Sequence, residues 1–269
     1  MTPSEKVVRR GGVEISVTDY ENNLPPVVLL HGLAGSSREL RPTAEALSDS
    51  FRVLLIDQRG HGRSTRRPED LSRQAFVDDV VCVLEQLAPG QRVTLIGQSM
   101  GAHTAFLTAT RRPDLLHRLV MLEGHVAGED DSGDTARAIG TYFATWPASF
   151  QDRAAARAFL GDSPLAKAWL EDLESTPSGL RPRFDPDIME QTITAVHVSY
   201  WEEWEHLAVP TMAIFGEQGM FSTEQQDELI RRRPGTERAV IKGAGHDAHL
   251  ENHLGWIAGL REYLSRPLP

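Results

Sequence analysis

The sequence has little of what marks membrane proteins, disulfide-stapled proteins or nucleic-acid-binding proteins. It holds one cysteine, Cys82, so no disulfide can form within the chain, and that count fits a reducing compartment. No apolar run approaches the length of a membrane span, and residues 1–10 lack the apolar stretch of a signal peptide. The net charge of −10 argues against nucleic acid and anionic membranes as partners. We therefore expect a cytoplasmic protein without a membrane partner.

The remaining composition is that of an ordinary globular protein, with 40% hydrophobic and 25% charged residues among 269. This length suffices for one large domain or for a core with an inserted subdomain. His246 and His249 have a suggestive spacing for metal binding, but we find no further ligands to complete a set. We expect no metal and no cofactor, a small-molecule substrate as the partner, and a monomer or homodimer.

Strand and helix patterns alternate through most of the chain. Short apolar runs predict buried strands at residues 27–30, 51–56, 93–96, 119–122, 209–215 and 238–241. Apolar residues at helical spacing predict helices at residues 38–47, 72–87, 223–232 and 248–264. Alternating stretches on both sides of Gly11-Gly12 predict an antiparallel hairpin. This order predicts an α/β fold with a mostly parallel central sheet covered by helices on both faces.

The alternation is interrupted between residues 125 and 206. This segment has helix-like patterns at residues 135–143, 153–159, 164–173 and 188–204 and contains no good strand. We interpret it as a helical cap inserted over one end of the sheet. The predicted domains are accordingly a core of residues 1–124 and 207–269 and a cap of residues 125–206.

The most informative stretch is Gly97-Gln98-Ser99-Met100-Gly101, between a predicted strand and a predicted helix. In this context G-x-S-x-G forms a sharp, strained turn that lifts the central serine above the sheet. Glycines on each side remove the Cβ atoms that would clash. The start of the following helix favours negative charge nearby. Ser99 is therefore a candidate nucleophile.

Three further loops follow predicted strands at the same edge of the sheet. Catalytic groups of an open parallel sheet gather beyond the carboxyl ends of its strands. The loops begin at His31-Gly32-Leu33, at Glu123 and at Gly243-Ala244-Gly245-His246. A histidine held by glycines on the last loop can reach Ser99 as a general base, which makes His246 the candidate.

Four motifs together resemble the α/β-hydrolase fold family with a helical cap. They are His31-Gly32, Asp57-x-Arg59-Gly60-His61-Gly62-x-Ser64, the Ser99 pentapeptide, and Gly243-Ala-Gly-His246-x-x-His249-Leu250-Glu251. They span nearly the whole chain in the family's order. Together they are highly specific for the fold and much less so for the substrate.

The resemblance implies roles for the residues at matching positions. Ser99 would be the nucleophile, and His246 the general base and later the general acid. The backbone N–H groups of Met100 and Leu33 would form the oxyanion hole. The remaining motif residues would mainly brace their loops; they are His31, Asp57, Arg59 and His61.

The acid of the catalytic triad is where the sequence departs from the family's commonest pattern. An aspartate is expected after the seventh strand, but Gly219 occupies that position, and glycine cannot orient an imidazole. Glu123 is the preferred replacement, because it ends the sixth strand and can accept the Nδ1–H of His246. Glu217 is the alternative, and an absent or water-mediated partner is a third possibility.

Several residues near the cap and after the strand at 209–215 are candidates to contact a substrate. Three residues share one helical face by spacing and could wall an apolar substrate cleft, namely His197, Trp201 and Trp204. Packing of the cap against the core is the competing interpretation. The candidate substrate-binding residues are Gly32, His125, Trp201, Trp204, Met220 and Phe221.

The predicted function is cleavage of an ester, lactone or thioester bond in a small, largely apolar substrate, through an acyl-enzyme on Ser99. Haloalkane dehalogenases and epoxide hydrolases share the fold but need an aspartate nucleophile, which position 99 does not supply. Carbon–carbon bond hydrolysis, a lyase step and perhydrolysis are alternatives on the same fold. A ligand-binding receptor with little turnover is another.

Overall fold

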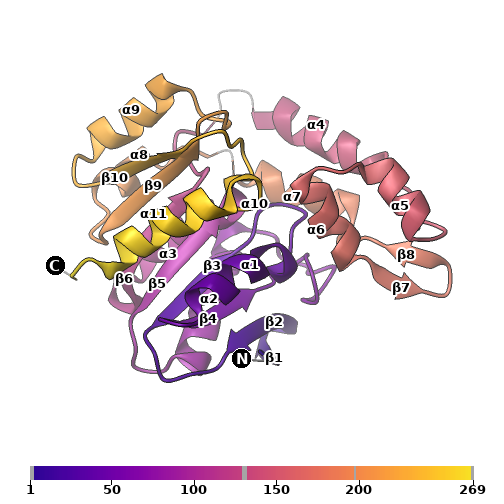
Figure 1. The fold of residues 1–269 in the computed structure, drawn as a ribbon, viewed down its shortest axis with the longest axis horizontal. Coiled ribbons are helices and arrows are strands. Elements are labelled where there is room, and N and C mark those ends of the chain that lie inside the picture. The colour runs from indigo at the N-terminus through magenta and orange to yellow at the C-terminus, as the bar shows by residue number, and fades with distance from the viewer. Residues whose placement is uncertain (1–2, 129–131, 197, 268–269) are drawn as a thin grey trace.

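The computed structural model describes residues 3–128, 132–196 and 198–267, and its centre is an eight-stranded sheet (Figure 1). The strands lie in the order β1-β2-β4-β3-β5-β6-β9-β10. β1 pairs antiparallel with β2, β2 pairs antiparallel with β4, and the other pairings in this sheet are parallel. The strand bounds are Ser4–Arg10 (β1), Val13–Tyr20 (β2), Pro26–Leu30 (β3), Arg52–Ile56 (β4), Val93–Gln98 (β5), Leu116–Leu122 (β6), Thr211–Gly216 (β9) and Glu237–Ile241 (β10). This arrangement confirms the predicted mostly parallel sheet.

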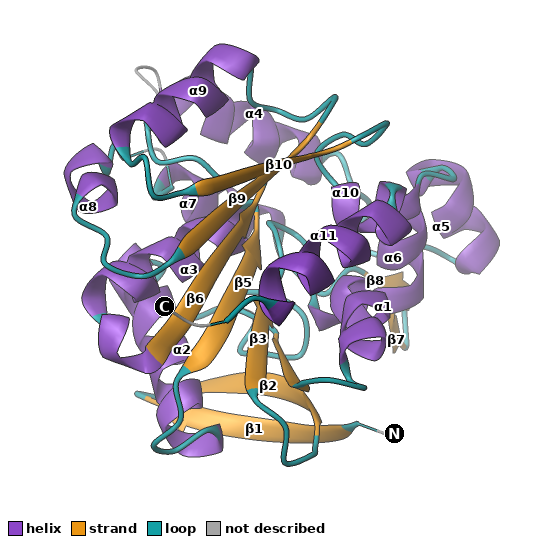
Figure 2. Cartoon of the chain, turned by 60° about the vertical axis from the view of Figure 1, so that its left-hand side comes forward, coloured by secondary structure: helices purple, strands orange, loops and turns teal. Residues whose placement is uncertain are grey.

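Helices cover both faces of the sheet, as Figure 2 shows. On one face lie α1 (Ser37–Leu47) and α11 (His253–Ser265), whose apolar residues join those of the strands in one buried cluster. On the other face α2 (Arg73–Leu87), α3 (Met100–Arg111) and α9 (Thr223–Arg232) contribute to a second cluster. The central strands are continuously apolar because both of their faces are covered.

A mainly helical layer lies beyond the carboxyl ends of the strands, formed by the chain between β6 and β9 (Figure 1). Its elements are α4 (Ser132–Ala144), α5 (Arg153–Leu160), α6 (Pro164–Asp172), β7 (Glu174–Thr176), β8 (Gly179–Arg181) and α7 (Pro186–Thr194). The last helix of this segment, α8 (Trp201–Glu205), instead packs beside α9 (Figure 2). The layer has its own aromatic cluster around Phe143, Trp146 and Phe184, with ring centroids 5.0 to 5.7 Å apart.

The structure corrects two expectations about this helical layer. First, β7 and β8 form a short antiparallel hairpin where no strand was predicted, and β8 begins directly after the turn at Gly179, with φ 121°. Second, the helix predicted at 188–204 is two helices, α7 and α8. The Tyr200 N–H donates to the carbonyl of Val126 at 2.8 Å, which ties this segment to the chain after β6 before α8 begins.

The predicted closing helix at 248–264 is also divided, into α10 (Ala248–Glu251) and α11. Asn252 separates the two helices with φ −132° and ψ 68°. Its side-chain oxygen accepts the Gly255 N–H at 3.0 Å, so it caps the start of α11. The break therefore follows from an N-cap in the middle of an apolar pattern.

Helix α3 crosses β5 and β3 so closely that only glycine fits at the contact. A Cβ atom on Gly97 would lie 2.1 Å from the carbonyl oxygen of Gly101. A Cβ atom on Gly101 would lie 2.4 Å from the carbonyl oxygen of Leu30. Backbone atoms cannot move aside as flexible side chains do, so both glycines are required by packing.

Replacing Gly97 by alanine should therefore lower the free energy of unfolding by about 1–3 kcal/mol or more, because the new methyl group overpacks the crossing. The matched control is Gly259→Ala in α11, where a Cβ atom would meet no heavy atom within 4 Å. That substitution should raise stability by about 0.5–1 kcal/mol, since alanine favours helix. Urea denaturation of both variants is the measurement. A neutral Gly97→Ala would contradict the packing argument.

Candidate active site

Ser99 lies in the turn between β5 and α3 with φ 53° and ψ −119°, a backbone conformation that non-glycine residues seldom adopt. Its N–H donates to the carbonyl of Leu122 at 2.8 Å, and its own carbonyl accepts the His103 N–H at 3.1 Å. Met100 is the first residue of α3, so its N–H has no acceptor within the helix. The turn thus places a serine hydroxyl beside the N-terminus of a helix.

The Glu123 carboxylate is buried directly after β6 and is held by backbone donors. Oε1 accepts the Gly216 N–H at 2.8 Å, and Oε2 accepts the Met220 N–H at 2.8 Å. Oε2 also lies 3.5 Å from Nδ1 of His246, at the outer limit of a hydrogen bond. The contact favours the tautomer with a proton on Nδ1, which leaves Nε2 as the acceptor.

The absence of a side chain at Gly219 leaves room for the Glu123 carboxylate. A Cβ atom on Gly219 would lie 2.0 Å from Oε1 of Glu123, so the glutamate fills the room that a side chain at 219 would need. Glu217 instead accepts the Gly243 N–H at 2.9 Å in an exposed position. Of the two carboxylates considered from the sequence, the geometry brings Glu123 to the imidazole.

The pKa of His246 lies above its ordinary value of 6.5. Burial lowers the pKa of this ring, but the hydrogen bond to Glu123 and the charges of Asp247, Glu123 and Glu251 together outweigh burial. On the other side of the ring, Nε2 lies 3.3 Å from the side-chain nitrogen of Gln98. An amide donor at this point fits an unprotonated Nε2.

Buried side chains hold the loop after β3, which carries Leu33. Nδ1 of His31 donates to the Gly32 carbonyl at 2.7 Å, and Nε2 accepts the Gln58 N–H at 3.0 Å. Trp169, from α6, donates its Nε1–H to the Ala34 carbonyl at 2.9 Å. The conformation of this loop therefore depends on both the core and the helical layer.

The other motif residues brace the loop after β4. Asp57 accepts backbone N–H groups of Ser37 and Arg63 at 2.6 and 2.9 Å. Arg59 pairs with Asp79 through two hydrogen bonds of 2.6 and 2.7 Å. His61 lies among these groups, and burial lowers its pKa to about 3. These contacts hold the loop after β4 in place.

Ser99 and His246 line the same cavity of about 560 Å³ beneath α4 and α6. One face of α4 forms its outer wall, through Thr135, Ala138, Ile139 and Tyr142. At the core end of the cavity lie two carboxyl groups, Glu39 and Asp247. Burial, followed by the Asp247 charge, raises the pKa of Glu39 well above its usual range, and burial also raises the pKa of Asp247.

A smaller cavity of about 140 Å³ also reaches Ser99, from the side of α3 and α9. It is lined by three of the six predicted substrate-binding residues. His125 and Phe221 line this smaller cavity, Met220 lines both cavities, and Gly32 lines the larger one.

Trp204 was predicted to contact a substrate, but the structure places it in the core. Trp201 lies behind His125, which lines the smaller cavity. Trp204 has no exposed surface, packs against Phe106, and donates its Nε1–H to the Leu229 carbonyl at 2.9 Å. It belongs to the core because α8 packs on α9, not over the substrate cavities. Trp201 packs edge-on against His125 at 5.3 Å and does not itself line either cavity among the described residues. His197, which shared the predicted face, lies outside the described residues.

Sequence reasoning missed several residues of the larger cavity. The α4 residues at 135, 138, 139 and 142 follow helical one-face spacing, which is a signal that could have found them. Gln98 and Asp247 are the immediate neighbours of Ser99 and His246 in the sequence. Glu39 has no comparable signal, because only the turn of α1 against the loop after β3 brings its carboxyl to Gly32 at 3.3 Å.

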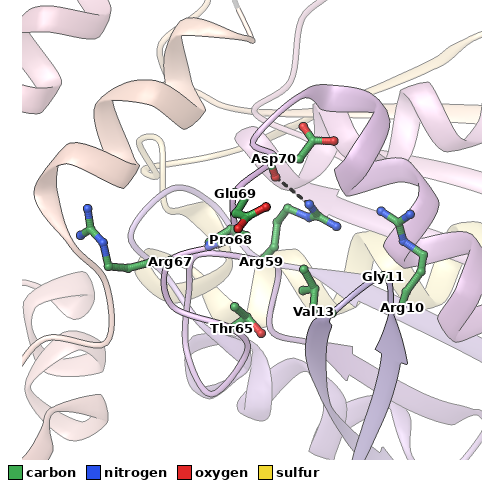
Figure 3. Close-up of a pocket in the computed structure, with 10 residues that line it drawn as sticks. Arg10, Gly11, Val13, Arg59, Thr65, Arg67, Pro68, Glu69 and Asp70 are labelled. Atoms are coloured by element: carbon green, nitrogen blue, oxygen red, sulfur yellow. Dashed lines mark hydrogen bonds between the residues drawn. The ribbon is translucent and has the colours of Figure 1, made fainter.

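Another cavity, of about 430 Å³, lies between the β1–β2 turn and the loop after β4 (Figure 3). Three arginines line it, but each is already engaged by carboxylates. Arg10 and Arg59 pair with Asp79, and Arg67 pairs with Asp185 and Asp187. These guanidinium groups are already paired within the protein, and Ser99 does not line this cavity.

Within residues 3–128, 132–196 and 198–267, no three His, Cys, Asp or Glu side chains are grouped to hold a metal ion. Within the same ranges no helix has both the length and the apolar character to cross a membrane.

The chain belongs to the α/β-hydrolase fold family, whose sequence model it matches over residues 25–253. It is 27% identical to Esterase YbfF of Escherichia coli over 262 residues, which cover 94% of this chain and 98% of that protein. It is 26% identical over 238 residues to the 2-(acetamidomethylene)succinate hydrolase of Mesorhizobium japonicum, covering 82% and 81% of the two chains.

Solved structures agree on the fold. A crystal structure of E-2-(acetamidomethylene)succinate hydrolase superposes with a TM-score of 0.88 over 98% of this chain and 100% of that chain, at 22% identity. The thioesterase domain from the curacin biosynthetic pathway gives a TM-score of 0.80 over 97% of this chain and 100% of that chain, also at 22% identity. Relatives in sequence are hydrolases and esterases, which supports an α/β-hydrolase enzyme.

Glu123→Gln tests the geometry of the Glu123–His246 contact. Whatever reaction His246 serves as a base, its rate should rise with pH through a midpoint above 6.5 in the wild type. Removing the carboxylate should lower the pKa of His246, move this midpoint to lower pH, and reduce kcat by about 10²- to 10⁴-fold. The control is Glu217→Gln, whose rate and midpoint should match the wild type. A loss with Glu217→Gln instead would reassign the acid.

Moving the acid to the next loop tests the complementarity of Gly219 and Glu123. Gly219→Asp alone should be nearly inactive, because its Cβ would collide with the Glu123 carboxylate. Combined with Glu123→Ala, which empties that space, Gly219→Asp should recover at least about tenfold in kcat over Glu123→Ala alone. Ester hydrolysis by the three variants is the measurement. A double variant no better than Glu123→Ala would show that a carboxylate from residue 219 cannot reach the ring.

Proposed function

We propose that the protein is a serine hydrolase that cleaves an ester, lactone or thioester bond in a small, largely apolar substrate. The observation that carries the proposal is that Ser99 and His246 line one cavity while Glu123 holds the opposite nitrogen of the imidazole. These are the positions of nucleophile, base and orienting acid in a catalytic triad. The names of the relatives, which include an esterase, support the same reaction class.

In the proposed reaction, Ser99 Oγ attacks the substrate carbonyl while Nε2 of His246 takes the hydroxyl proton. The tetrahedral oxyanion accepts hydrogen bonds from the backbone N–H groups of Met100 and Leu33. His246 then gives its proton to the leaving group, and the acyl-enzyme forms. Water, deprotonated by the same histidine, releases the acid and restores Ser99.

We also propose that residues 125–206 act as the cap over this site. The helices of this segment supply the apolar wall of the larger cavity, and Trp169 holds the loop of Leu33. Enclosure by such a layer excludes water and strengthens the hydrogen bonds that stabilise the oxyanion. Cap and core would therefore act as one catalytic unit.

The charge of the larger cavity supports a substrate without carboxylate groups. Glu39 and Asp247 line it, and no lysine or arginine does so among the described residues. A dicarboxylate, as named for the Mesorhizobium relative, would find no cation to pair with in this lining, and the raised pKa values of Glu39 and Asp247 reflect how poorly the cavity accommodates negative charge. A neutral ester avoids that cost.

The first test is hydrolysis of p-nitrophenyl acetate and butyrate by wild type and Ser99→Ala. The variant should lose about 10³- to 10⁶-fold in kcat, because the nucleophile of the acyl-enzyme is gone. A fluorophosphonate probe should add its mass to the peptide containing Ser99 in the wild type only. Ser50→Ala, an exposed serine away from the cavities, is the matched control and should keep full activity.

The same experiment separates the alternatives. Equal rates for wild type and Ser99→Ala would rule out the acyl-enzyme mechanism. Ligand binding by a wild type that turns over none of these esters would point to a receptor. Products other than the free acid and alcohol would point to a lyase step, carbon–carbon bond cleavage or perhydrolysis.

A further inference from the structure

Resting on the proposed function, we propose that Ser99 divides the substrate between two unequal cavities. The larger cavity takes the leaving alcohol or thiol, and the smaller one takes the acyl group. The enzyme would then act on short-chain acyl esters of bulky, uncharged alcohols or thiols.

The two cavities meet at the nucleophile. The larger has a volume of about 560 Å³ and the smaller about 140 Å³. Ser99, Ile193 and Met220 line both cavities, so they form the boundary. The two oxyanion donors are split between them, with Leu33 on the larger cavity and Met100 on the smaller. A carbonyl carbon bonded to Ser99 therefore has one cavity on each side.

The position of His246 decides which end of the substrate enters which cavity. When the acyl-enzyme forms, a bond from Ser99 Oγ to the carbonyl carbon is made and the bond to the leaving oxygen or sulfur is broken. The proton taken from Ser99 passes through Nε2 of His246 to that leaving atom. The leaving atom must therefore lie beside His246, which lines the larger cavity and not the smaller.

The sizes of the cavities set the sizes of the two groups. An apolar cavity of about 150 Å³ holds one benzene ring, or about six carbon atoms. The smaller cavity therefore accommodates acyl groups up to roughly hexanoyl. The larger cavity falls within the range of about 300–1,000 Å³ that is typical of sites for whole small molecules.

One wall of the smaller cavity is held in place by ring contacts. The His125 ring is held from both ends, since Nδ1 accepts the Ala127 N–H at 3.1 Å and Nε2 donates to the Gln225 carbonyl at 3.1 Å. Phe221 stacks on it with a centroid distance of 5.1 Å and an angle of 22°. Trp201 supports the other side of the ring edge-on. We therefore expect this wall to resist displacement by a longer acyl chain.

Two series of esters test the proposal with the wild-type protein, followed by pH-stat titration. The acyl series is benzyl acetate, butyrate, hexanoate and octanoate. The alcohol series is methyl, benzyl and 2-naphthylmethyl acetate, all esters of primary alcohols. We expect kcat/KM to fall by at least about tenfold from hexanoate to octanoate, since each excluded methylene has an effect of this size. Along the alcohol series kcat/KM should rise.

Two variants assign the effects to their cavities. Phe221→Ala should raise kcat/KM for octanoate relative to acetate by about tenfold and leave the order of the alcohol series unchanged. Tyr142→Ala, in the wall of the larger cavity, should flatten the alcohol series and leave the acyl limit at hexanoate. These opposite effects cannot result from a general loss of folding.

The reverse preference would overturn the proposal: octanoate cleaved as well as acetate, with methyl esters favoured over naphthylmethyl esters. Hydrolysis would then still depend on Ser99, and the serine-hydrolase function would stand. Absence of hydrolysis in both series, or hydrolysis that survives Ser99→Ala, would instead refute the proposed function itself and this inference with it.

Discussion

The buried carboxylate of Glu123 is the contact on which the site's geometry depends. It accepts N–H groups from Gly216, in β9, and from Met220, in the following loop, and it faces Nδ1 of His246 from the loop after β10. Three strand ends are thereby joined through one side chain. A buried carboxylate is tolerated only while its donors stay in place, so the loop after β9 and the glutamate hold each other. The direction of the imidazole follows from the same contact, because fixing Nδ1–H turns Nε2 away from Glu123.

The core and the nucleophile turn could be predicted from the sequence because their signals are local. Apolar runs predicted the central strands, and the glycines flanking Ser99 predicted a sharp turn in which Cβ atoms would clash. The structure shows that the clash would be with the backbone of Gly101 and Leu30, where α3 crosses the sheet. Glu123 was predicted to face His246 on other grounds. Gly219 lacks a side chain where an aspartate is expected, and Glu123 follows the neighbouring strand. The structure adds that these two facts have one cause, since the glutamate occupies the volume that residue 219 leaves empty.

What could not be predicted depends on contacts between residues far apart in the chain. Helical spacing extends past position 200, but α7 ends at Thr194, and the hydrogen bond from Tyr200 to Val126 ties the chain to the segment after β6 before α8 begins, so Trp204 packs on the core. Asn252 caps a new helix inside an apolar pattern that is otherwise continuous. Glu39 has the sequence context of a solvated helix residue, yet the fold buries its carboxyl against the loop of Gly32. In each case tertiary packing overrides the local pattern.

The position of the Glu123 carboxylate and the two cavities at Ser99 are linked through residues 219–221. With the carboxylate supplied by β6, the loop after β9 needs no acidic side chain, and the Met220 N–H instead becomes a donor to Glu123. That hydrogen bond fixes Met220 on the boundary of the two cavities, and Phe221 next to it stacks on His125. The loop that holds the Glu123 carboxylate therefore also builds the wall of the smaller cavity. Under the proposed function, moving this carboxylate should consequently alter substrate selection as well as rate, because both depend on the same short loop.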